Sequence, residues 1–410
     1  MSDVEGTGDR PSALDPGEAG TSADPYPRYR AMREEMPRQR TDMGHWSLFR
    51  YADVARVLRD PRFGVDERRA ATPRTRFADR DPQRAPRGRS AILNVDPPDH
   101  TRLRRVVAPA FTPRAVDRLR SRIARLVDEA LDRVTPRGEM DVIADLAFPL
   151  PFTVISELLG MPGGEREELR RWAHVLAGTL EPVTDPAGLD AQREASDAMT
   201  AFVRDALAWK RRHPADDLLT ALLAGADRGE LRSEQELLDQ VILLYVAGHE
   251  TTVNLIGNGM LALLRHPAQL ERLVGDDGLD ADAVEELLRY DAPVQFSRRV
   301  ALEDVDLDEL TIEAGSLVLV CLGSANRDPD RFGPTADDLD LGRRDAGLHL
   351  SFGGGVHHCL GSSLARIEAR AAIGALVRRF PAIEATTDDP PWNGRVVLRG
   401  LDRLPVRLGP

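Results

Sequence analysis

Residues 351–370 read SFGGGVHHCLGSSLARIEAR. Three glycines precede a cysteine, and the residues after the cysteine have the pattern of a helix start. Because glycine has no side chain, this backbone can approach a flat partner closely. The free N–H groups at the start of the helix point back toward the sulfur of Cys359 and stabilise a thiolate there. The stretch therefore suggests an axial haem ligand. A cysteine protease nucleophile is the alternative, and it would need a partnered base and an accessible cleft.

The spacing of these residues also matches a known pattern. The segment Phe352-Gly353-x-Gly355-x-His357-x-Cys359-x-Gly361 resembles the F-G-x-G-x-H-x-C-x-G signature of the cytochrome P-450 family. Further segments resemble other elements of that family: Asp96-Pro97-Pro98-Asp99-His100 with Arg104, Ala247-Gly248-x-Glu250-Thr251-Thr252, Glu286-x-x-Arg289, and Ala325-Asn326-Arg327-Asp328-Pro329. The resemblance covers nearly all of residues 25–410. It implies haem b as cofactor, with an axial thiolate from Cys359.

Helical periodicity dominates the chain from Pro25 onward. We expect helices at 26–35, 52–59, 114–133, 165–178, 189–211, 234–265, 281–290 and 360–379. We expect short strands at 46–49, 300–301, 311–312, 317–322 and 395–399. The predicted fold class is therefore mainly α with a small β component. The resemblance implies the cytochrome P-450 fold, in which a long central helix lies over a haem. Residues 25–410 are expected to form a single domain, and the polar residues 1–24 a disordered tail.

Composition and charge argue against several classes of protein. The 410 residues carry a formal net charge of −12, which disfavours binding to nucleic acid or to an anionic membrane surface. Two cysteines make neither a disulfide framework nor a four-cysteine zinc site. The N-terminus lacks an apolar signal core, and no apolar run reaches the roughly 18 residues of a membrane span. We therefore expect a cytoplasmic protein with no nucleic-acid and no membrane partner.

The segment 234–265 is the longest predicted helix. Ser233 and Glu236 form a capping-box pattern at its start. Residues 241–247 (VILLYVA) are apolar on every face, so this part of the helix is expected to be buried. Residues 248–252 (GHETT) interrupt that pattern. They indicate either a packing glycine beside a turn that meets solvent, or a turn weakened where a ligand crosses the helix.

Four side chains are candidates to bind two haem propionates. His100 and Arg104 are four residues apart and share one helical face. Together with Arg299 and His357 they would supply the donors. Arg298 stands beside Arg299, so the assignment is open by one residue.

The resemblance implies further roles. Glu286 and Arg289 would form a buried structural ion pair, although an i,i+3 pair alone is usually a surface feature worth about 0.2–0.5 kcal/mol. Five further residues are implied to contact the haem or the oxygen groove: Ala247, Gly248, Phe352, Gly353 and Gly361.

The residues of the interrupted turn suggest a proton supply. Gly248 would leave room for dioxygen, Glu250 would relay protons from solvent, and the Thr251 hydroxyl would pass them on. Thr252 is an alternative to Thr251, and His249 is expected to point away from the haem. An acid beside an alcohol suits a monooxygenase.

The predicted reaction is therefore insertion of one oxygen atom from O₂ into a small hydrophobic compound. The closest resemblance is to soluble bacterial members of the family that act on polyketides or fatty-acyl groups. Val294 and Phe296 are expected to line the apolar end of the substrate pocket. The alternatives are a haem-binding sensor or carrier without turnover, and a family member that performs oxidative coupling or desaturation.

Two arginine-rich segments suggest partners. Residues 101–125 contain eight arginines and one acid, and with Arg366 and Arg370 they would bind an acidic electron donor. Only 51 residues follow Cys359, and they contain no further cysteine, so the electrons are expected to come from a separate ferredoxin and its reductase. Residues 62–89 hold nine arginines and four acids. They are either a solvated loop or, with Arg84 and Arg87, a site for an anionic or carrier-bound substrate.

Overall fold

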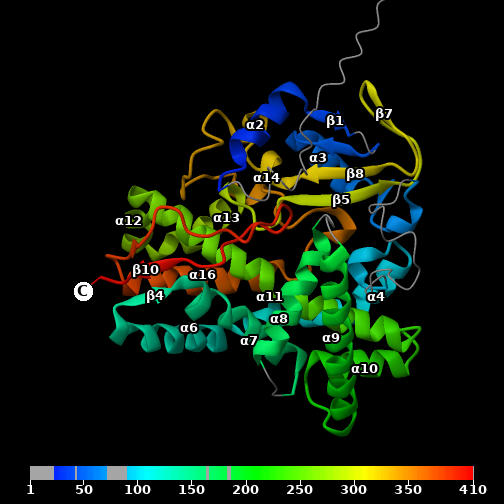
Figure 1. The fold of residues 1–410 in the computed structure, drawn as a ribbon, viewed down its shortest axis with the longest axis horizontal. Helices are drawn as coiled ribbons and strands as arrows, with labels where there is room; N and C mark the ends of the chain where they lie inside the picture. The colour runs from blue at the N-terminus through cyan, green and yellow to red at the C-terminus, as the bar shows by residue number, and fades with distance from the viewer. Residues whose placement is uncertain (1–22, 42–43, 72–89, 163–165, 182–185, 410) are drawn as a thin grey trace, which may run out of the picture.

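The computed structural model describes residues 23–41, 44–71, 90–162, 166–181 and 186–409. Figure 1 shows a five-stranded sheet with α2, α3 and α14 at one end of the molecule. Helices α6 to α10 lie at the other end, and α11 runs between the two parts. The predicted fold class, mainly α with a small β component, is confirmed.

The α-helices are α2 (Tyr26–Glu35), α3 (Tyr51–Arg59), α4 (Asp99–Val107), α5 (Pro113–Asp117), α6 (Arg120–Val134), α7 (Pro149–Leu159), α8 (Arg166–Ala177), α9 (Pro186–Arg212), α10 (Leu218–Asp227), α11 (Glu234–Arg265), α12 (Pro267–Gly275), α13 (Asp280–Tyr290), α14 (Leu322–Ala325), α15 (Pro329–Phe332) and α16 (Ser362–Arg379). The strands are β1 (Arg38–Arg40), β2 (Trp46–Leu48), β3 (Phe63–Gly64), β4 (Glu139–Asp141), β5 (Phe296–Ala301), β6 (Val305–Leu307), β7 (Leu310–Ile312), β8 (Leu317–Cys321), β9 (Glu384–Ala385) and β10 (Pro405–Arg407).

The largest sheet has the strand order β1-β2-β8-β5-β3. Strand β2 runs parallel to β8, and β5 runs antiparallel to β8 with Phe296 opposite Cys321. A second sheet has the order β4-β10-β9, and β6 pairs with β7. Strands β5 and β8, which lie between α13 and α16 in the chain, thus pair with β3 and β2 from the first part of the chain.

Helix α11 begins and ends where the sequence predicts. The Ser233 hydroxyl accepts a hydrogen bond from the Glu236 N–H at 3.1 Å, so the helix start has the expected cap. The predicted helix 114–133 is instead divided into α5 and α6. Helices α7, α10 and α12 had not been predicted. Helix α12 begins with Pro267 in its first turn, where proline is well tolerated.

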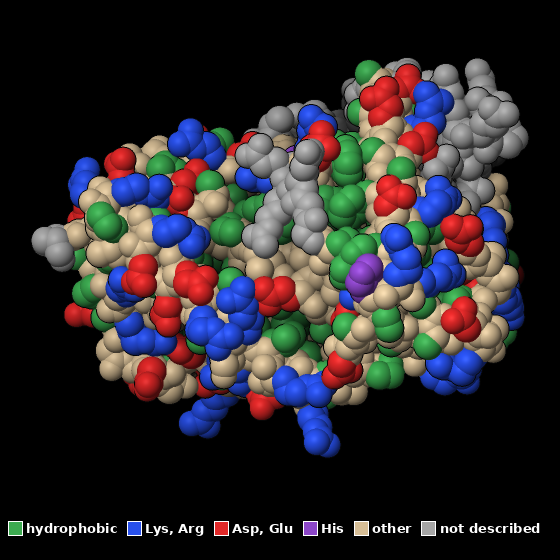
Figure 2. All heavy atoms as spheres, turned by 90° about the horizontal axis from the view of Figure 1, so that it is seen from below, with side chains coloured by type: hydrophobic (Ala, Val, Ile, Leu, Met, Phe, Trp, Pro, Cys, Tyr) green, Lys and Arg blue, Asp and Glu red, His purple; other side chains and the backbone are tan. Residues whose placement is uncertain are grey.

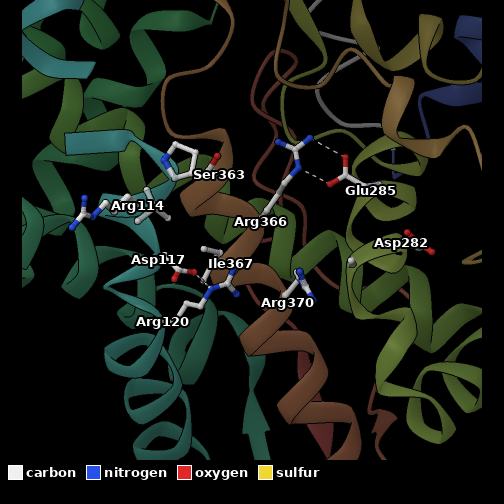
Figure 3. Close-up of a pocket in the computed structure, with 12 residues that line it drawn as sticks. Arg114, Asp117, Arg120, Asp282, Glu285, Ser363, Arg366, Ile367 and Arg370 are labelled. Carbon is white, nitrogen blue, oxygen red and sulfur yellow. Dashed lines mark hydrogen bonds and ion pairs between the residues drawn. The ribbon is translucent and has the colours of Figure 1, made fainter. Parts of the chain in front are cut away.

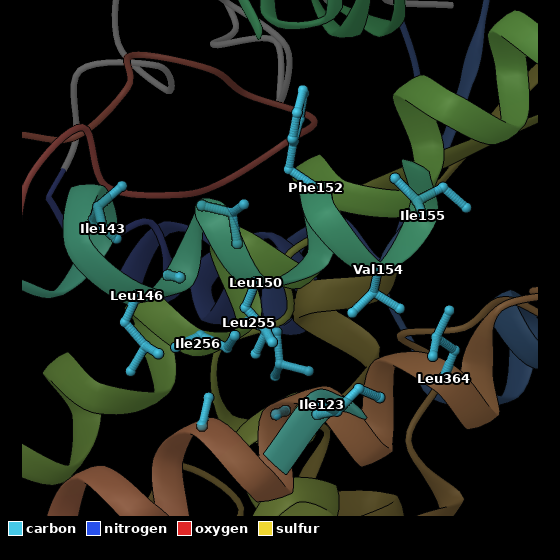
Figure 4. Packing of buried hydrophobic residues seen from close by; sticks show 14 of the residues in the cluster. Ile123, Ile143, Leu146, Leu150, Phe152, Val154, Ile155, Leu255, Ile256 and Leu364 are labelled. Carbon is cyan, nitrogen blue, oxygen red and sulfur yellow. The ribbon is translucent and has the colours of Figure 1, made fainter. Parts of the chain in front are cut away.

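The main core is formed where α6, α7 and α16 pack around α11. Ile123 of α6, Ile155 of α7, Leu255 of α11 and Leu364 of α16 belong to one cluster of buried hydrophobic residues, part of which is drawn in Figure 4. Each of these four side chains is almost fully buried. This packing fixes α11 relative to α16, and therefore relative to the glycine-rich loop that precedes α16.

Residues 395–399 do not form the predicted strand. Their one ladder contact is an isolated bridge between Leu398 and Val294. The Glu181 carboxylate accepts the backbone N–H groups of Val396, Val397 and Leu398, each at 2.9 Å. Because a side chain satisfies these donors, the segment needs no neighbouring strand.

Glu286 and Arg289 form a fully buried ion pair on α13. The Arg289 Nε–H donates to Glu286 at 2.7 Å, and the guanidinium also donates to the carbonyl oxygens of Asn326 and Ala336. The Glu286 carboxylate accepts the Asp340 N–H at 2.9 Å. The pair therefore ties α13 to the segment that leads into the glycine-rich loop.

The structure does not test the predicted disordered tail, the predicted single domain or the predicted cytoplasmic location. Residues 1–22 lie outside the described residues, while Ala23 accepts a hydrogen bond from Arg399. The division into a tail and one domain at 25–410, and the cytoplasmic location, stay predictions. In the described ranges, no helix combines the length and the apolar character that crossing a lipid bilayer requires. Figure 2 shows acidic and basic side chains interspersed over the face seen from below.

Candidate functional site

The glycine-rich loop is held close to α3. Gly355 has φ of +65°, and a Cβ atom at this position would lie 2.5 Å from the carbonyl oxygen of Leu58. Gly353 also has positive φ, at +68°. The Cys359 N–H donates to the carbonyl oxygen of Phe352 at 2.9 Å, which closes the loop just before α16. Only glycine permits both the backbone angle and the approach at position 355.

The two cysteines lie in different surroundings. Cys321 is fully buried, and burial raises the pKa of its thiol to about 12. Cys359 is exposed, yet desolvation by the protein around it raises the pKa of its thiol. The backbone N–H groups of Gly361 and Ser362 lower this pKa, but by less than desolvation raises it. A soft anion here, with backbone donors behind it, fits the role of a metal thiolate ligand.

The middle of α11 presents a short accessible surface. Ala247 is exposed and Thr251 is half-buried, one turn apart in a helix whose neighbouring turns are largely buried. The Thr251 hydroxyl donates to the carbonyl oxygen of Ala247 at 3.2 Å. Thr252 is buried, so Thr251 carries the accessible hydroxyl.

Gly248 has a different role from the expected one. A Cβ atom at this position would lie 2.8 Å from Cγ1 of Ile155, so its missing side chain allows α7 to pack against α11. The packing-glycine interpretation of the interrupted turn is therefore confirmed, and a ligand that crosses the helix at this turn stays a prediction. Gly248 is a packing glycine, and the open surface belongs to Ala247 and Thr251.

The candidate propionate donors include groups that lack an anionic partner. Arg299 is 4% exposed and donates to the Ser297 hydroxyl and the Arg298 carbonyl, without an ion pair among the described residues. Burial lowers the pKa of its guanidinium to about 10. The buried Nε2 atom of His357 has no hydrogen-bond partner, and Asp96 lies 3.8 Å from it. A buried cation and an orphan imidazole nitrogen fit a ligand that brings its own carboxylates.

His100 lies against this group. Its ring centroid is 4.3 Å from that of His357, and the two rings are inclined at 58°. Burial, followed by the charges of His357 and Arg104, lowers the pKa of His100 to about 4. Arg298, the alternative to Arg299, instead pairs with Glu67.

A family model described as cytochrome P450 (written P-450 below) matches residues 280–400. The protein cytochrome P-450 107B1 of Saccharopolyspora erythraea is 46% identical over 395 residues, which cover 94% of this chain and 95% of that protein. The chain belongs to the cytochrome P-450 family. It is also 42% identical to the cytochrome P-450 monooxygenase PikC of Streptomyces venezuelae, over 98% of this chain and 96% of that protein.

The fold of this P-450 is shared with solved relatives. The crystal structure of P450BioI in complex with an acyl carrier protein ligated to hexadec-9Z-enoic acid superposes with a TM-score of 0.85 and is 37% identical. The alignment covers 94% of this chain and 97% of that chain. The cytochromes P-450 are haem-thiolate enzymes, and this member is an oxidoreductase of the monooxygenase type with the predicted P-450 fold.

Arg104 of this P-450 holds the glycine-rich loop directly. Its guanidinium donates to the carbonyl oxygens of Val356 and His358, both at 3.0 Å. A guanidinium has five N–H donors, so these two bonds leave others for an anion. The sequence had indicated a propionate donor, and it gave no sign of this second contact.

Asp96, the acid that begins the DPPDH segment, has a structural role. Its carboxylate accepts the N–H groups of Val65 and Asp66, at 2.8 and 3.3 Å. Gly64 lies so close that a Cβ atom there would meet Asp96. Asp96 therefore fixes the start of α4, which carries His100 and Arg104, against β3.

Glu250 is held by two side chains, those of Arg395 and His174. The Arg395 guanidinium donates to Glu250 Oε1 at 2.8 Å, and His174 Nδ1 lies 3.4 Å from the same oxygen. Burial raises the pKa of Glu250, but the contact with His174 and the charge of Arg395 outweigh it and hold the pKa below its ordinary value. His249 is fully buried beside Phe152, and its Nδ1–H donates to the carbonyl oxygen of Tyr245 at 2.8 Å.

The two residues predicted to line the pocket differ in position. Val294 is half-buried and packs against the core of the large sheet. Phe296 is 3% exposed, and its ring meets the Tyr29 ring edge-on at 5.7 Å. Phe296 therefore belongs to the core between α2 and the sheet rather than to a pocket wall. Arg84 and Arg87 lie outside the described residues.

A groove of about 640 Å³ lies beside the first turns of α16. Figure 3 shows Arg114 and Arg370 at its walls, with Ser363 and Ile367 of α16 also lining it. Arg366, expected to be part of a free basic patch, instead forms a bidentate pair with Glu285 at 2.5 and 2.8 Å.

Several other arginines of the predicted patch are also paired. Arg102 binds Glu236, Arg120 pairs with Asp117, and Arg122 binds Glu157. Five arginines of the patch have no side-chain hydrogen bond or ion pair within the described parts of the chain: Arg105, Arg114, Arg118, Arg125 and Arg370. The free positive charge is therefore smaller than the sequence indicated, and part of it lines the groove.

Proposed function

We propose that this P-450 inserts an oxygen atom into a hydrophobic fatty-acyl or polyketide compound that binds beside Ala247 and Thr251. One observation carries the proposal: Cys359 and the turn at Ala247 are both accessible, although they belong to elements that pack together in the core. The relative P450BioI binds a fatty acid carried by an acyl carrier protein, which supports an acyl chain as the substrate class.

The same proposal assigns the haem-binding residues. Cys359 would hold the haem iron through its thiolate, and Arg299, His100, His357 and Arg104 would bind the propionates. The unpaired charge of Arg299 and the free Nε2 of His357 support this assignment. When bound, the haem supplies the activation of dioxygen.

The proton supply follows from the contacts of Glu250. His174 has a side chain that is 54% exposed and lies 3.4 Å from Glu250 Oε1, so its imidazole can pass a proton from solvent to the carboxylate. Glu250 then presents the proton to the turn that carries the Thr251 hydroxyl. The Thr251 hydroxyl leaves the Ala247 carbonyl and donates into the open space beside it.

A ferredoxin is the proposed electron donor, and the groove beside α16 is its proposed docking surface. Ser363 lies four residues after Cys359, so a protein seated there approaches the thiolate side. Arg114 and Arg370 carry positive charge without partners, which suits an acidic protein. The reductase is a further protein in this scheme.

The test is a titration of the purified haem protein with fatty acids, acyl carrier protein thioesters, polyketides and steroids, followed by absorbance. Ligands that shift the spectrum are then supplied with a surrogate ferredoxin, its reductase and NAD(P)H. Substrate-dependent product formation supports the monooxygenase. Binding without NAD(P)H consumption would instead indicate a haem-binding carrier.

A matched set of three ligands tests the form of the substrate. A fatty acid, its neutral amide and its carrier-protein thioester share one chain and differ in charge and size. We expect the acid or the thioester to bind more tightly than the amide. Equal affinity of all three would reject both an anionic and a carrier-bound substrate, and reversing Arg84 and Arg87 to Glu tests whether those two residues select the anion.

A further inference from the structure

Helix α16 contains a buried carboxyl group that the proposed mechanism does not use. Glu368 is 1% exposed, and it lies in one row with Leu364 and Ala372, four residues away on either side. Both neighbours in this row are buried and apolar. The side chain of Glu368 therefore points into the interface between α16 and the core, where an acid has no structural need to be.

Neither oxygen of Glu368 has a well-formed hydrogen bond, and no cation of the described chain forms an ion pair with it. An isolated carboxylate in such a place would be costly, because it loses its hydration without gaining a partner. Burial raises the pKa of Glu368 well above its ordinary value, and contact with the Thr252 hydroxyl is the opposing influence.

Thr252 connects this acid to the functional turn. Successive residues of a helix are about 100° apart, so Glu250 and Thr252 flank Thr251 from opposite sides. On one side, Glu250 is ionised and paired with Arg395. On the other side, buried Thr252 faces Glu368. Two acids whose pKa values are shifted in opposite directions therefore flank the same turn, an arrangement that elsewhere separates the roles of paired carboxyl groups.

We propose that Glu368 is a neutral carboxylic acid that donates its O–H to the Thr252 hydroxyl and so fixes the turn that presents Thr251. Glu368 is then a positioning residue that acts through Thr252. A neutral acid serves this purpose because it is a donor that brings no charge into the core. The link to proton supply rests on the role proposed above for Thr251, whereas the protonation state of Glu368 does not.

Infrared spectroscopy of the holoenzyme at neutral pH tests the protonation state. The carbonyl stretch of a protonated carboxyl group that shifts in D₂O should be present in the parent protein and absent from Glu368→Gln. Glu250→Gln is the matched control and should keep the band, since Glu250 is ionised. If Glu368→Gln retains the band, Glu368 is charged and the proposal fails, whatever the enzyme turns over.

Product formed per NAD(P)H consumed tests the positioning role. Glu368→Leu should lower this ratio several-fold, as Thr252→Val should, while Glu368→Gln should recover most of it because an amide also donates a hydrogen bond. The double variant Glu368→Leu/Thr252→Val should be no worse than either single variant, since both remove one contact. Additive losses, or equal losses for Gln and Leu at position 368, would overturn the proposal. Unfolding midpoints of all variants show whether each one is folded.

Discussion

Arg395 donates a hydrogen bond of 2.8 Å to Glu250, a residue 145 positions earlier in the chain. A second N–H of the same guanidinium donates to the carbonyl oxygen of His174 at 2.7 Å. One arginine therefore joins the C-terminal loop, α11 and α8 at the acid that we propose as the proton relay.

Replacing Arg395 should destabilise the protein in a pH-dependent way. Arg395→Gln leaves Glu250 buried with a weaker partner, and the loss of a buried pair costs about 3 kcal/mol. The folded-state pKa of Glu250 lies below its ordinary value, so its contribution is present above the ordinary pKa of 4.5 and disappears as pH falls through the folded value. The gap between the denaturant midpoints of the parent and Arg395→Gln should therefore be large at pH 7 and small at acid pH. A gap that stays constant would show that Arg395 acts by packing alone.

Thr251→Ala should separate electron consumption from product formation. The variant should bind substrate almost normally, but more of the NAD(P)H consumed should appear as hydrogen peroxide. Thr251→Ser keeps the hydroxyl and is the matched control. Glu250→Gln should slow turnover instead, by about tenfold or more, since general acid catalysis typically contributes at least that much. An unchanged product yield in Thr251→Ala and an unchanged rate in Glu250→Gln would remove both residues from the proton supply.

Cys359→Ala should abolish thiolate ligation. The ferrous carbon monoxide complex of the parent should show the red-shifted Soret band that thiolate ligation produces, and the variant should lack it. Cys321→Ala is the control, because Cys321 is fully buried against α14 and should leave the band in place. Loss of the band from Cys321→Ala alone would reverse the assignment.

Charge reversal in the groove beside α16 should slow electron delivery. Arg114→Glu with Arg370→Glu should reduce the rate of ferredoxin-driven reduction by roughly tenfold at low ionic strength, and the difference should shrink as salt is added. Arg193→Glu, on α9 and already paired with Asp190, is the matched control. Peroxide-driven turnover needs no partner and should be unaffected. Equal rates for the two sets of variants at low salt would mean that the donor docks on another surface.

Gly355→Ala should destabilise the loop far more than a comparable substitution elsewhere. Gly44 also has positive φ, at +79°, but a Cβ atom there would meet nothing within 4 Å. Gly44→Ala should therefore cost about 1 kcal/mol for its backbone angle alone. Gly355→Ala adds the clash with Leu58, for a total of about 3 kcal/mol, and should also release haem more readily. Similar unfolding midpoints for the two variants would contradict the close approach.

The sequence predicts helices well where one face is apolar and the ends are capped. Helix α2 has the predicted bounds, and Ser233 marks the start of α11. The same reasoning does not predict helix α7, because its sequence, PLPFTVISELL, is apolar on nearly every side and therefore has no helical periodicity. The predicted strand at 395–399 is wrong because its donors bind Glu181, an acid in an unrelated segment.

Local patterns indicate which residues lie together at the proposed haem site, but not which other contacts hold them. The spacing of His100 and Arg104 predicts a shared face, whereas the bonds from Arg104 to the loop carbonyls depend on tertiary packing. Glu368 stands in the segment LARIEAR, which looks like an exposed helical face. Its burial follows from the way α16 lies against α11, and that arrangement cannot be inferred from the segment alone.

The four residues 395–398 bind Glu250 through one side chain and Glu181 through three backbone N–H groups. In laboratory evolution of this enzyme toward a different substrate, substrate selectivity and the position of Glu250 would therefore change together. Any change that moves the end of α8 also moves Arg395, which binds Glu250. Variants with altered substrate selectivity should therefore consume more NAD(P)H for each molecule of product. Compensating substitutions should then accumulate at His174, Glu181 and Arg395, far from the groups that touch the new molecule.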